Sequence, residues 1–139
     1  MSVADCVFRW TERYKVNVAL LDQQHQELFD VVNELEQALR VGEGHTAIDR
    51  VLDKLLTYAG LHFAAEESLM ERHHFPGLPT HRLQHEMYRK KLLTFLENHR
   101  TARAGVPVEL LLYLHSWFKQ HLLETDKLYS KFLNERGIR

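Results

Sequence analysis

Seven residues that can bind metal ions fall in four separate amphipathic segments of this 139-residue chain. They occur as a single histidine, as H-x-x-x-E, as H-x-x-x-H and as H-x-x-x-x-D, and they are His25, His62, Glu66, His81, His85, His121 and Asp126. Imidazole nitrogen suits iron and other transition metals, and carboxylates that point into a helix bundle can bridge two metal ions. Five imidazoles and two carboxylates, with one group on each of four helices, therefore predict a site for a pair of metal ions.

The spacing within these groups fits helices that present their ligands inward. Four residues turn an α-helix by about 400°, so His62 and Glu66 share one face, as do His81 and His85. His121 and Asp126 are five residues apart, which separates them by about 140° on a regular helix. Because both are expected to reach one centre, we predict a wide turn of π type between them, with at least one i→i+5 hydrogen bond.

Neither spacing is specific alone, because H-x-x-x-H occurs by chance and an i, i+4 pair is an ordinary surface contact. The combination is more informative, since the candidates lie on or beside the apolar stripe of each segment. An unpaired imidazole or carboxylate in that position would cost several kcal/mol, and metal coordination removes the cost. The alternative is a set of core histidines that Glu66 and Asp126 satisfy, and it requires seven coincidences.

Helical periodicity and turn residues predict four helices, over about 22–39, 46–73, 81–102 and 107–135. Thr80 is expected to cap the third helix, whose inner stripe would hold Leu83, Met87, Leu92, Phe95 and Leu96. No segment shows a convincing strand alternation. The predicted fold class is all-α, an up-down-up-down four-helix bundle over residues 21–136.

An irregular N-terminal arm, residues 1–20, is expected to pack on this bundle through apolar anchors. These anchors are Phe8, Trp10, Tyr14 and Val16.

The length and composition predict one domain, residues 1–139. Apolar residues make up 45% of the chain, which is enough for a hydrophobic core. A net charge of −1 gives no electrostatic case for nucleic acid or an anionic membrane. The N-terminus does not read as a signal peptide, and no run approaches the roughly 18 apolar residues of a membrane span. Cys6 is the one cysteine, so an internal disulfide is impossible and a reducing, cytoplasmic location is expected.

The ligand types favour iron over zinc. A ferritin-like site would need two E-x-x-H motifs, and Glu71 with His74 is the one useful match, at a helix end. Zinc usually takes four ligands. Seven ligands suit two ions of higher coordination number with one position left open, and an oxide or hydroxide bridge would reduce the positive charge.

With these residues in this order, the chain resembles the hemerythrin family, and bacterial hemerythrins in particular. An upstream W-x-x-x-Y-x-V and the segment L-D-Q-Q-H around His25 strengthen the resemblance, which runs from about Trp10 to Tyr129.

The resemblance implies a cofactor of two iron ions (Fe²⁺/Fe³⁺) with an oxo or hydroxo bridge. One iron would take His81, His85 and His121, the other would take His25 and His62 and keep a vacant position, and Glu66 and Asp126 would bridge both. Dioxygen would bind at the vacant position.

Reversible binding of dioxygen needs a site that excludes water and protons. Leu28, Phe63, Trp117 and Leu122 adjoin ligand positions and are the predicted oxygen pocket, although each could equally serve core packing alone. Gln24 could orient a ligand imidazole, but an exposed glutamine is the simpler interpretation. The remaining histidines are not expected to be ligands; they are His45, His73, His74, His99 and His115.

The predicted function is reversible dioxygen binding by a carrier, store or delivery protein rather than an enzyme. The alternatives are a di-iron oxidase, peroxidase or nitric oxide reductase, or an oxygen- or iron-sensing module that signals to a partner. Dioxygen is the expected ligand, a protein recipient of oxygen is a further candidate partner, and a monomer is favoured. Nucleic acid and membrane insertion are not expected.

Overall fold

The computed structural model describes residues 9–139, so Cys6 and the arm anchor Phe8 lie outside the described residues. The helical elements in chain order are η2 (Glu12–Tyr14), α1 (Ala19–Arg40), α2 (Gly44–Arg72), α3 (Leu78–Arg100), α4 (Val106–Gln120), η3 (His121–Thr125) and α5 (Asp126–Glu135). The last three elements follow one another without a break and form a single rod.

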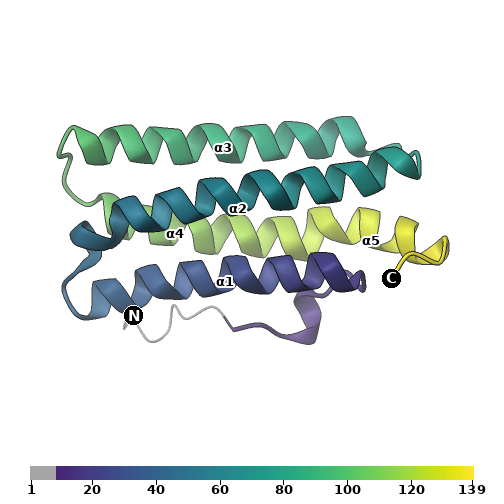
Figure 1. Cartoon of the computed structure of the whole chain (residues 1–139), viewed down its shortest axis with the longest axis horizontal. Helices are drawn as coiled ribbons and strands as arrows, with labels where there is room; N and C mark the ends of the chain where they lie inside the picture. Colours follow the sequence, from purple (N-terminus) through teal and green to yellow (C-terminus); the bar gives the residue numbers. More distant parts are fainter. Residues whose placement is uncertain (1–8) are drawn as a thin grey trace.

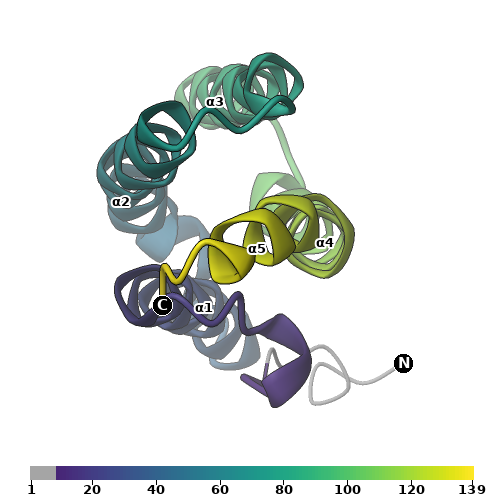
Figure 2. The ribbon, with the colours of Figure 1, turned by 90° about the vertical axis from the view of Figure 1, so that its right-hand side faces the viewer.

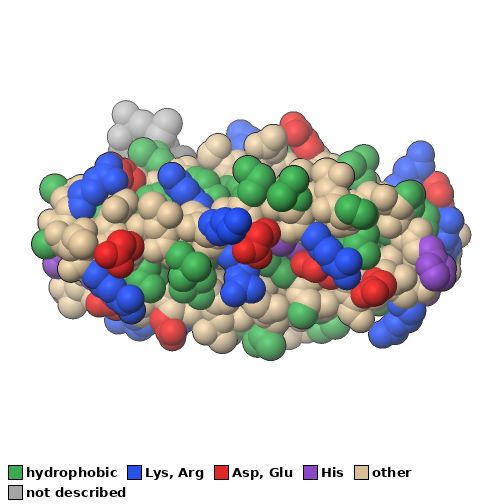
Figure 3. Space-filling model, turned by 90° about the horizontal axis from the view of Figure 1, so that it is seen from above, with side chains coloured by type: hydrophobic (Ala, Val, Ile, Leu, Met, Phe, Trp, Pro, Cys, Tyr) green, Lys and Arg blue, Asp and Glu red, His purple; other side chains and the backbone are tan. Residues whose placement is uncertain are grey.

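Four rods lie side by side and alternate in direction (Figure 1). Seen from one end, α1 neighbours α2 and the α4–α5 rod, and α3 lies on the other side of both (Figure 2). The predicted all-α, up-down-up-down bundle is thus confirmed. Within the described residues, no helix is both long and apolar enough to cross a membrane. Acidic and basic side chains are interspersed on the face shown in Figure 3, with apolar side chains scattered among them.

Two helices begin three residues earlier than predicted. The first starts at Ala19 rather than near residue 22, which shortens the irregular arm. The third starts at Leu78, so Thr80 does not cap it; Gly77 precedes the helix and Pro79 occupies its first turn. A proline in that position fits, because the first backbone N–H groups of a helix have no intrahelical partner.

The inner stripe predicted for α3 is partly wrong. Leu83 and Met87 are 60% and 61% exposed, whereas the buried face of α3 carries His81, His85, Tyr88, Leu92 and Phe95. Residues two apart on a helix differ by about 200°, so Leu83 points away from the face of its neighbours His81 and His85.

The core consists of two apolar clusters with the seven candidate ligands between them. Along α1 the smaller cluster contributes Leu21, the candidate His25 follows, and the larger cluster begins with Leu28. The same order holds on α2, where Phe63 and Met70 belong to different clusters and flank Glu66. The polar layer is therefore sealed by apolar packing along the bundle axis.

The described part of the arm packs on the bundle, as predicted. The rings of Trp10 and Tyr14 lie 5.4 and 4.9 Å from that of Phe29. The backbone N–H of Val16 donates to Asp22 Oδ1 at 2.7 Å, and Ser130 Oγ donates to the Val16 carbonyl at 2.7 Å. These contacts tie the arm to the first and last helices.

Candidate metal centre

The structure brings all seven predicted ligands into one buried cluster, and none is more than 3% exposed. They come from four rods, because α1, α2 and α3 carry the first five while η3 and the start of α5 carry His121 and Asp126. All seven residues that the sequence patterns indicated therefore meet in this cluster.

Glu66 lies at the middle of the cluster, and its two oxygens face different histidines. Oε1 contacts His62 Nε2 and lies 3.5 Å from His25 Nε2. Oε2 lies 3.2 Å from His81 Nε2 and 4.0 Å from His85 Nε2. We call His25 and His62 the two-histidine side, and His81, His85 and His121 the three-histidine side.

Each side forms a group with Glu66 in which all the potential ligand atoms lie within 4.8 Å of one another. Asp126 spans the same two sides. Its Oδ2 lies 3.3 Å from His25 Nε2, and its Oδ1 lies 2.9 Å from His121 Nε2. Two carboxylates thus stand between two sets of imidazoles.

A π-helical turn places Asp126 in the cluster. The backbone N–H of Asp126 donates to the carbonyl of His121, which is an i→i+5 bond within the π-helix η3. This wider turn returns residues five apart to nearly one face, which a regular helix would hold about 140° apart. The predicted π-type turn is confirmed.

Three of the imidazoles form a hydrogen bond through Nδ1 to an acceptor on another helix. His62 Nδ1 lies 2.7 Å from Gln24 Oε1, His85 Nδ1 lies 2.8 Å from Glu67 Oε2, and His121 Nδ1 lies 3.1 Å from Gln84 Oε1. Because these oxygens accept, Nδ1 carries the proton and donates. The Nε2 lone pair then points to the centre, as a metal ligand requires.

Each of these acceptors is the direct sequence neighbour of a candidate ligand on the preceding helix. Gln24 precedes His25, Glu67 follows Glu66 and Gln84 precedes His85. The simpler interpretation of Gln24 as exposed was wrong, since its side chain is partly buried and bonded to His62. Glu67 and Gln84 were missed, and their position beside a ligand was the one available signal.

Burial sets the protonation of the imidazoles. It lowers the pKa of His25 and of His121 to about 4, and that of His85 to about 2. These three rings are therefore neutral at pH 7, the form that binds metal.

Burial also acts on the two carboxyl groups, with opposite net results. It raises the pKa of Asp126 well above its usual range, and the charge of Glu66 adds to this. Burial opposes ionisation of Glu66 as well, but His62 and His25 beside it hold its pKa well below the usual range. Two carboxylates that share a site do not both ionise readily without a cation between them.

The donor atoms fit a pair of metal ions. Among the described residues, several buried ligand atoms of the cluster have no hydrogen-bond partner; they are Nε2 of His25, His62, His85 and His121, Oε1 of Glu66 and both carboxyl oxygens of Asp126. Buried polar atoms without partners are costly and rare. Metal ions at the centre would satisfy them all at once.

Of the four predicted pocket residues, two stack on candidate ligands and two are buried leucines. The Phe63 ring stacks on the His85 imidazole at 3.6 Å with an interplanar angle of 5°, and the Trp117 ring stacks on that of His121 at 4.2 Å and 14°. Leu28 and Leu122 are each 2% exposed. The five other histidines belong to neither ligand group.

Fold and site together define a four-helix-bundle protein with a buried, histidine-rich cation site. Residues 16–133 match the family model for the hemerythrin HHE cation binding domain. The chain belongs to the hemerythrin family.

Curated relatives and solved structures agree with this assignment. The chain is 27% identical over 126 residues to a bacteriohemerythrin of Methylococcus capsulatus, covering 90% of this chain and 95% of the relative. It is 29% identical over 120 residues to a myohemerythrin of Sipunculus nudus, covering 86% and 88%. A crystal structure of wild-type hemerythrin superposes with a TM-score of 0.81 at 26% identity, covering 90% of this chain and 96% of that one.

Proposed function

We propose that the seven clustered residues hold two iron ions and that this pair binds dioxygen reversibly. The observation that carries the proposal is the position of Glu66, whose two oxygens face two separate sets of imidazoles. A single ion would leave one of these sets without a metal.

The two sides would have different roles. His81, His85 and His121 would hold one iron, His25 and His62 the other, and Glu66 and Asp126 would bridge the two. The two-histidine side has one imidazole fewer, which would leave a position for dioxygen. An iron pair supplies the two electrons that dioxygen takes on binding and returns on release.

The chain's own side chains would keep that exchange reversible. Gln24, Glu67 and Gln84 fix the tautomer and orientation of three ligands, so the donor atoms are in place before metal binds. Apolar side chains such as Leu28 and Leu122 would exclude water and protons from bound dioxygen. This is the requirement of a carrier, and we place the chain among dioxygen carriers rather than enzymes.

Metal analysis after iron-replete expression tests the cofactor. We expect two irons per chain, no haem, and the charge-transfer spectrum of an oxo-bridged ferric pair in the oxidised protein. One zinc per chain would contradict the assignment.

Repeated cycles of oxygenation and deoxygenation test the function, with the optical spectrum as the readout. Full recovery of the deoxygenated spectrum supports a carrier, whereas sustained consumption of dioxygen or peroxide would indicate an enzyme.

A further inference from the structure

A row of stacked aromatic rings leads from the candidate ligand His121 toward the surface between α3 and α4. Trp117 stacks on His121 with 4.2 Å between ring centroids and 14° between planes. Tyr88 stacks on Trp117 at 4.2 Å and 27°, and Tyr113 stacks on Tyr88 at 6.2 Å and 16°. We call Tyr113, Tyr88 and Trp117 the ring stack.

Successive rings from His121 to Tyr113 lie nearly parallel, with 14° to 27° between their planes. Tyr113, Trp117 and His121 are spaced four apart on one rod, so they share a face, and Tyr88 reaches them from α3. The rings around Phe29 instead meet edge to face, at 77° to Trp10 and 74° to Tyr14. Parallel overlap of π systems favours electron tunnelling, whose rate falls exponentially with the width of each gap.

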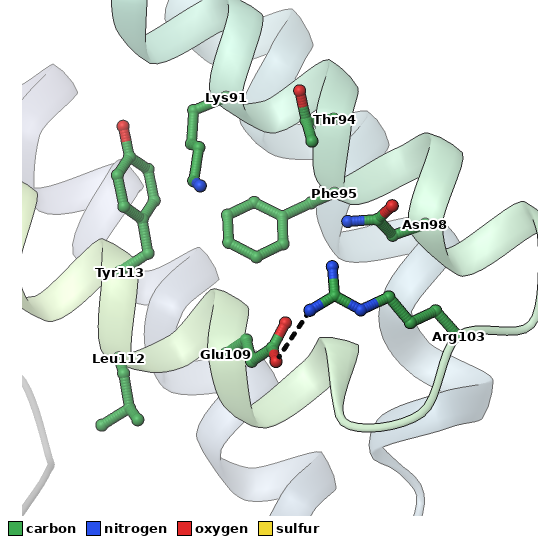
Figure 4. Close-up of a pocket in the computed structure, with 8 residues that line it drawn as sticks. All are labelled: Lys91, Thr94, Phe95, Asn98, Arg103, Glu109, Leu112 and Tyr113. Atoms are coloured by element: carbon green, nitrogen blue, oxygen red, sulfur yellow. Dashed lines mark hydrogen bonds and ion pairs between the residues drawn. The ribbon is translucent and has the colours of Figure 1, made fainter.

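The outer end of the ring stack forms the wall of a groove of about 420 Å³. In Figure 4 the Lys91 ammonium lies between the rings of Tyr113 and Phe95, and Asn98 and Arg103 lie beside the same opening. Volumes of about 300 to 1,000 Å³ are usual for small-molecule sites.

The chemistry of this groove suits an anion that contains a planar aromatic ring. Lys91 Nζ lies 5.3 Å from the Phe95 ring centroid and 5.8 Å from that of Tyr113, and within residues 9–139 no carboxylate forms an ion pair with it. Arg103 lies 3.4 Å from Glu109 and is partly neutralised. The groove thus combines aromatic walls with a cation whose charge is not matched, which fits an aromatic ring system joined through a side chain to a phosphate.

We propose that this groove docks a reduced flavin with a phosphate, of the flavin mononucleotide class, and that the ring stack conducts its electrons to the iron pair. The inference rests on the proposed di-iron function. One flavin hydroquinone gives up two electrons and two protons and becomes oxidised flavin. The electrons cross the ring stack one at a time and reduce two ferric ions to ferrous, while the protons pass to solvent.

The route has two properties that suit this task. His121 belongs to the three-histidine side, so electrons would arrive away from the position left for dioxygen. The Tyr88 hydroxyl is buried and has no hydrogen-bond partner among the described residues, and burial raises its pKa well above its usual range. It therefore has no group to take its proton, and its ring serves as a tunnelling bridge rather than as a site of radical formation.

Anaerobic stopped-flow reduction of the oxidised, iron-loaded protein tests the route. The probe is flavin mononucleotide hydroquinone, and reduced riboflavin, which has the same ring without the phosphate, is the comparison. Wild-type protein should be reduced faster by the phosphate form. Tyr113→Leu and Trp117→Leu should each slow reduction by about tenfold or more, equivalent to about 1.4 kcal/mol of barrier. Tyr88→Phe, which retains the ring, should retain most of the rate.

Two further measurements isolate the groove. Lys91→Gln should abolish the preference for the phosphate form, and titration calorimetry with oxidised flavin mononucleotide should show weaker binding to this variant than to wild type. Tyr14→Leu is the matched control, because Tyr14 stacks on Trp10 beside His25 on the two-histidine side and should leave reduction unchanged.

Unchanged rates in Tyr113→Leu would overturn the proposal, even if Trp117→Leu were slow, because electrons would then enter at the edge of Trp117. Absence of flavin binding in the calorimeter would also overturn it. Iron content and oxygenation cycles are measured on the same samples. If oxygenation cycles are normal and the variants are reduced at the wild-type rate, only this electron route is refuted. A wild-type protein without two irons would instead refute the proposed function.

Discussion

The two sides of the candidate metal centre are built differently. On the three-histidine side, His85 and His121 line surface grooves of about 410 and 200 Å³. On the two-histidine side, His25 lies against Trp10 of the N-terminal arm, with 6.5 Å between ring centroids, and is 1% exposed. The side with more ligands thus borders the surface, while the side proposed to bind dioxygen lies under the arm.

The partners that hold the imidazoles also differ between the sides. On the three-histidine side a carboxylate, Glu67, holds His85 and an amide, Gln84, holds His121, whereas on the two-histidine side an amide, Gln24, holds His62. A carboxylate acceptor makes the imidazole a stronger electron donor to its metal than an amide does. Ligand number and the one carboxylate acceptor would both favour the iron proposed for the three-histidine side, and would leave the iron proposed for the two-histidine side open for dioxygen.

Removal of the carboxylate that both sides share should disrupt the whole centre. Glu66→Ala should lose most of its iron, because both sides depend on this one side chain. The matched control is His45→Ala, which changes a histidine outside both ligand groups and should retain the wild-type iron content. Metal analysis decides the outcome, and two irons with normal oxygenation in Glu66→Ala would show that Glu66 is not the bridge.

Removal of a single supporting acceptor should affect one side only. Glu67→Ala should weaken the iron of the three-histidine side, and Gln24→Ala that of the two-histidine side, by about 10- to 100-fold in affinity. Iron release to a chelator measures this. Glu71→Ala is the control for Glu67, because Arg82 pairs with both carboxylates, at 3.1 and 3.2 Å. Equal release from Glu67→Ala and Glu71→Ala would assign Glu67 to the surface ion pair alone.

Truncation of the apolar wall should shorten the lifetime of the oxygenated form. Leu28→Ala lies one turn from His25, so water should reach bound dioxygen and supply the protons with which it leaves as hydrogen peroxide. The iron pair, which gives up two electrons in this step, would be left oxidised several-fold faster. Leu92→Ala is the control, because Leu92 is also a buried core residue but lies farther along α3 from the ligands. Each change should cost about 2 to 5 kcal/mol of stability. The decay of the oxygenated spectrum distinguishes the two, and equal decay would reduce Leu28 to a packing role.

Acidification should destabilise the iron-free protein. The lowered pKa values of His25, His85 and His121 mean that the unfolded chain binds more protons than the folded one below about pH 6.5. Stability is therefore fully present above that pH and is lost as pH falls toward 4.

The same measurement separates His62 from these three histidines. Burial disfavours the charged form of His62, but Glu66 beside it raises its pKa overall, so His62 has the opposite dependence. His85→Leu should flatten the pH dependence of the denaturant midpoint, and His62→Leu should steepen it. Identical slopes in both variants would show that His62 and His85 titrate alike.

The sequence by itself determined which residues were expected to meet in the buried cluster and how their spacing would bring them there. Ligand pairs four apart must share a helix face, and the five-residue gap between His121 and Asp126 required a wider turn, which the structure contains. These features depend on the geometry of one helix at a time, so spacing is enough to predict them.

The tertiary structure decided how neighbouring helices meet. The pairing of Gln84 with His121, the carboxylate behind His85 and the outward position of Leu83 all depend on the rotation of each helix about its axis. That rotation is set by packing against the neighbouring helices. The sequence of α3 has apolar residues on both sides of the helix, so the sequence did not determine this rotation. In the structure, His81, His85 and Tyr88 lie on the inner face.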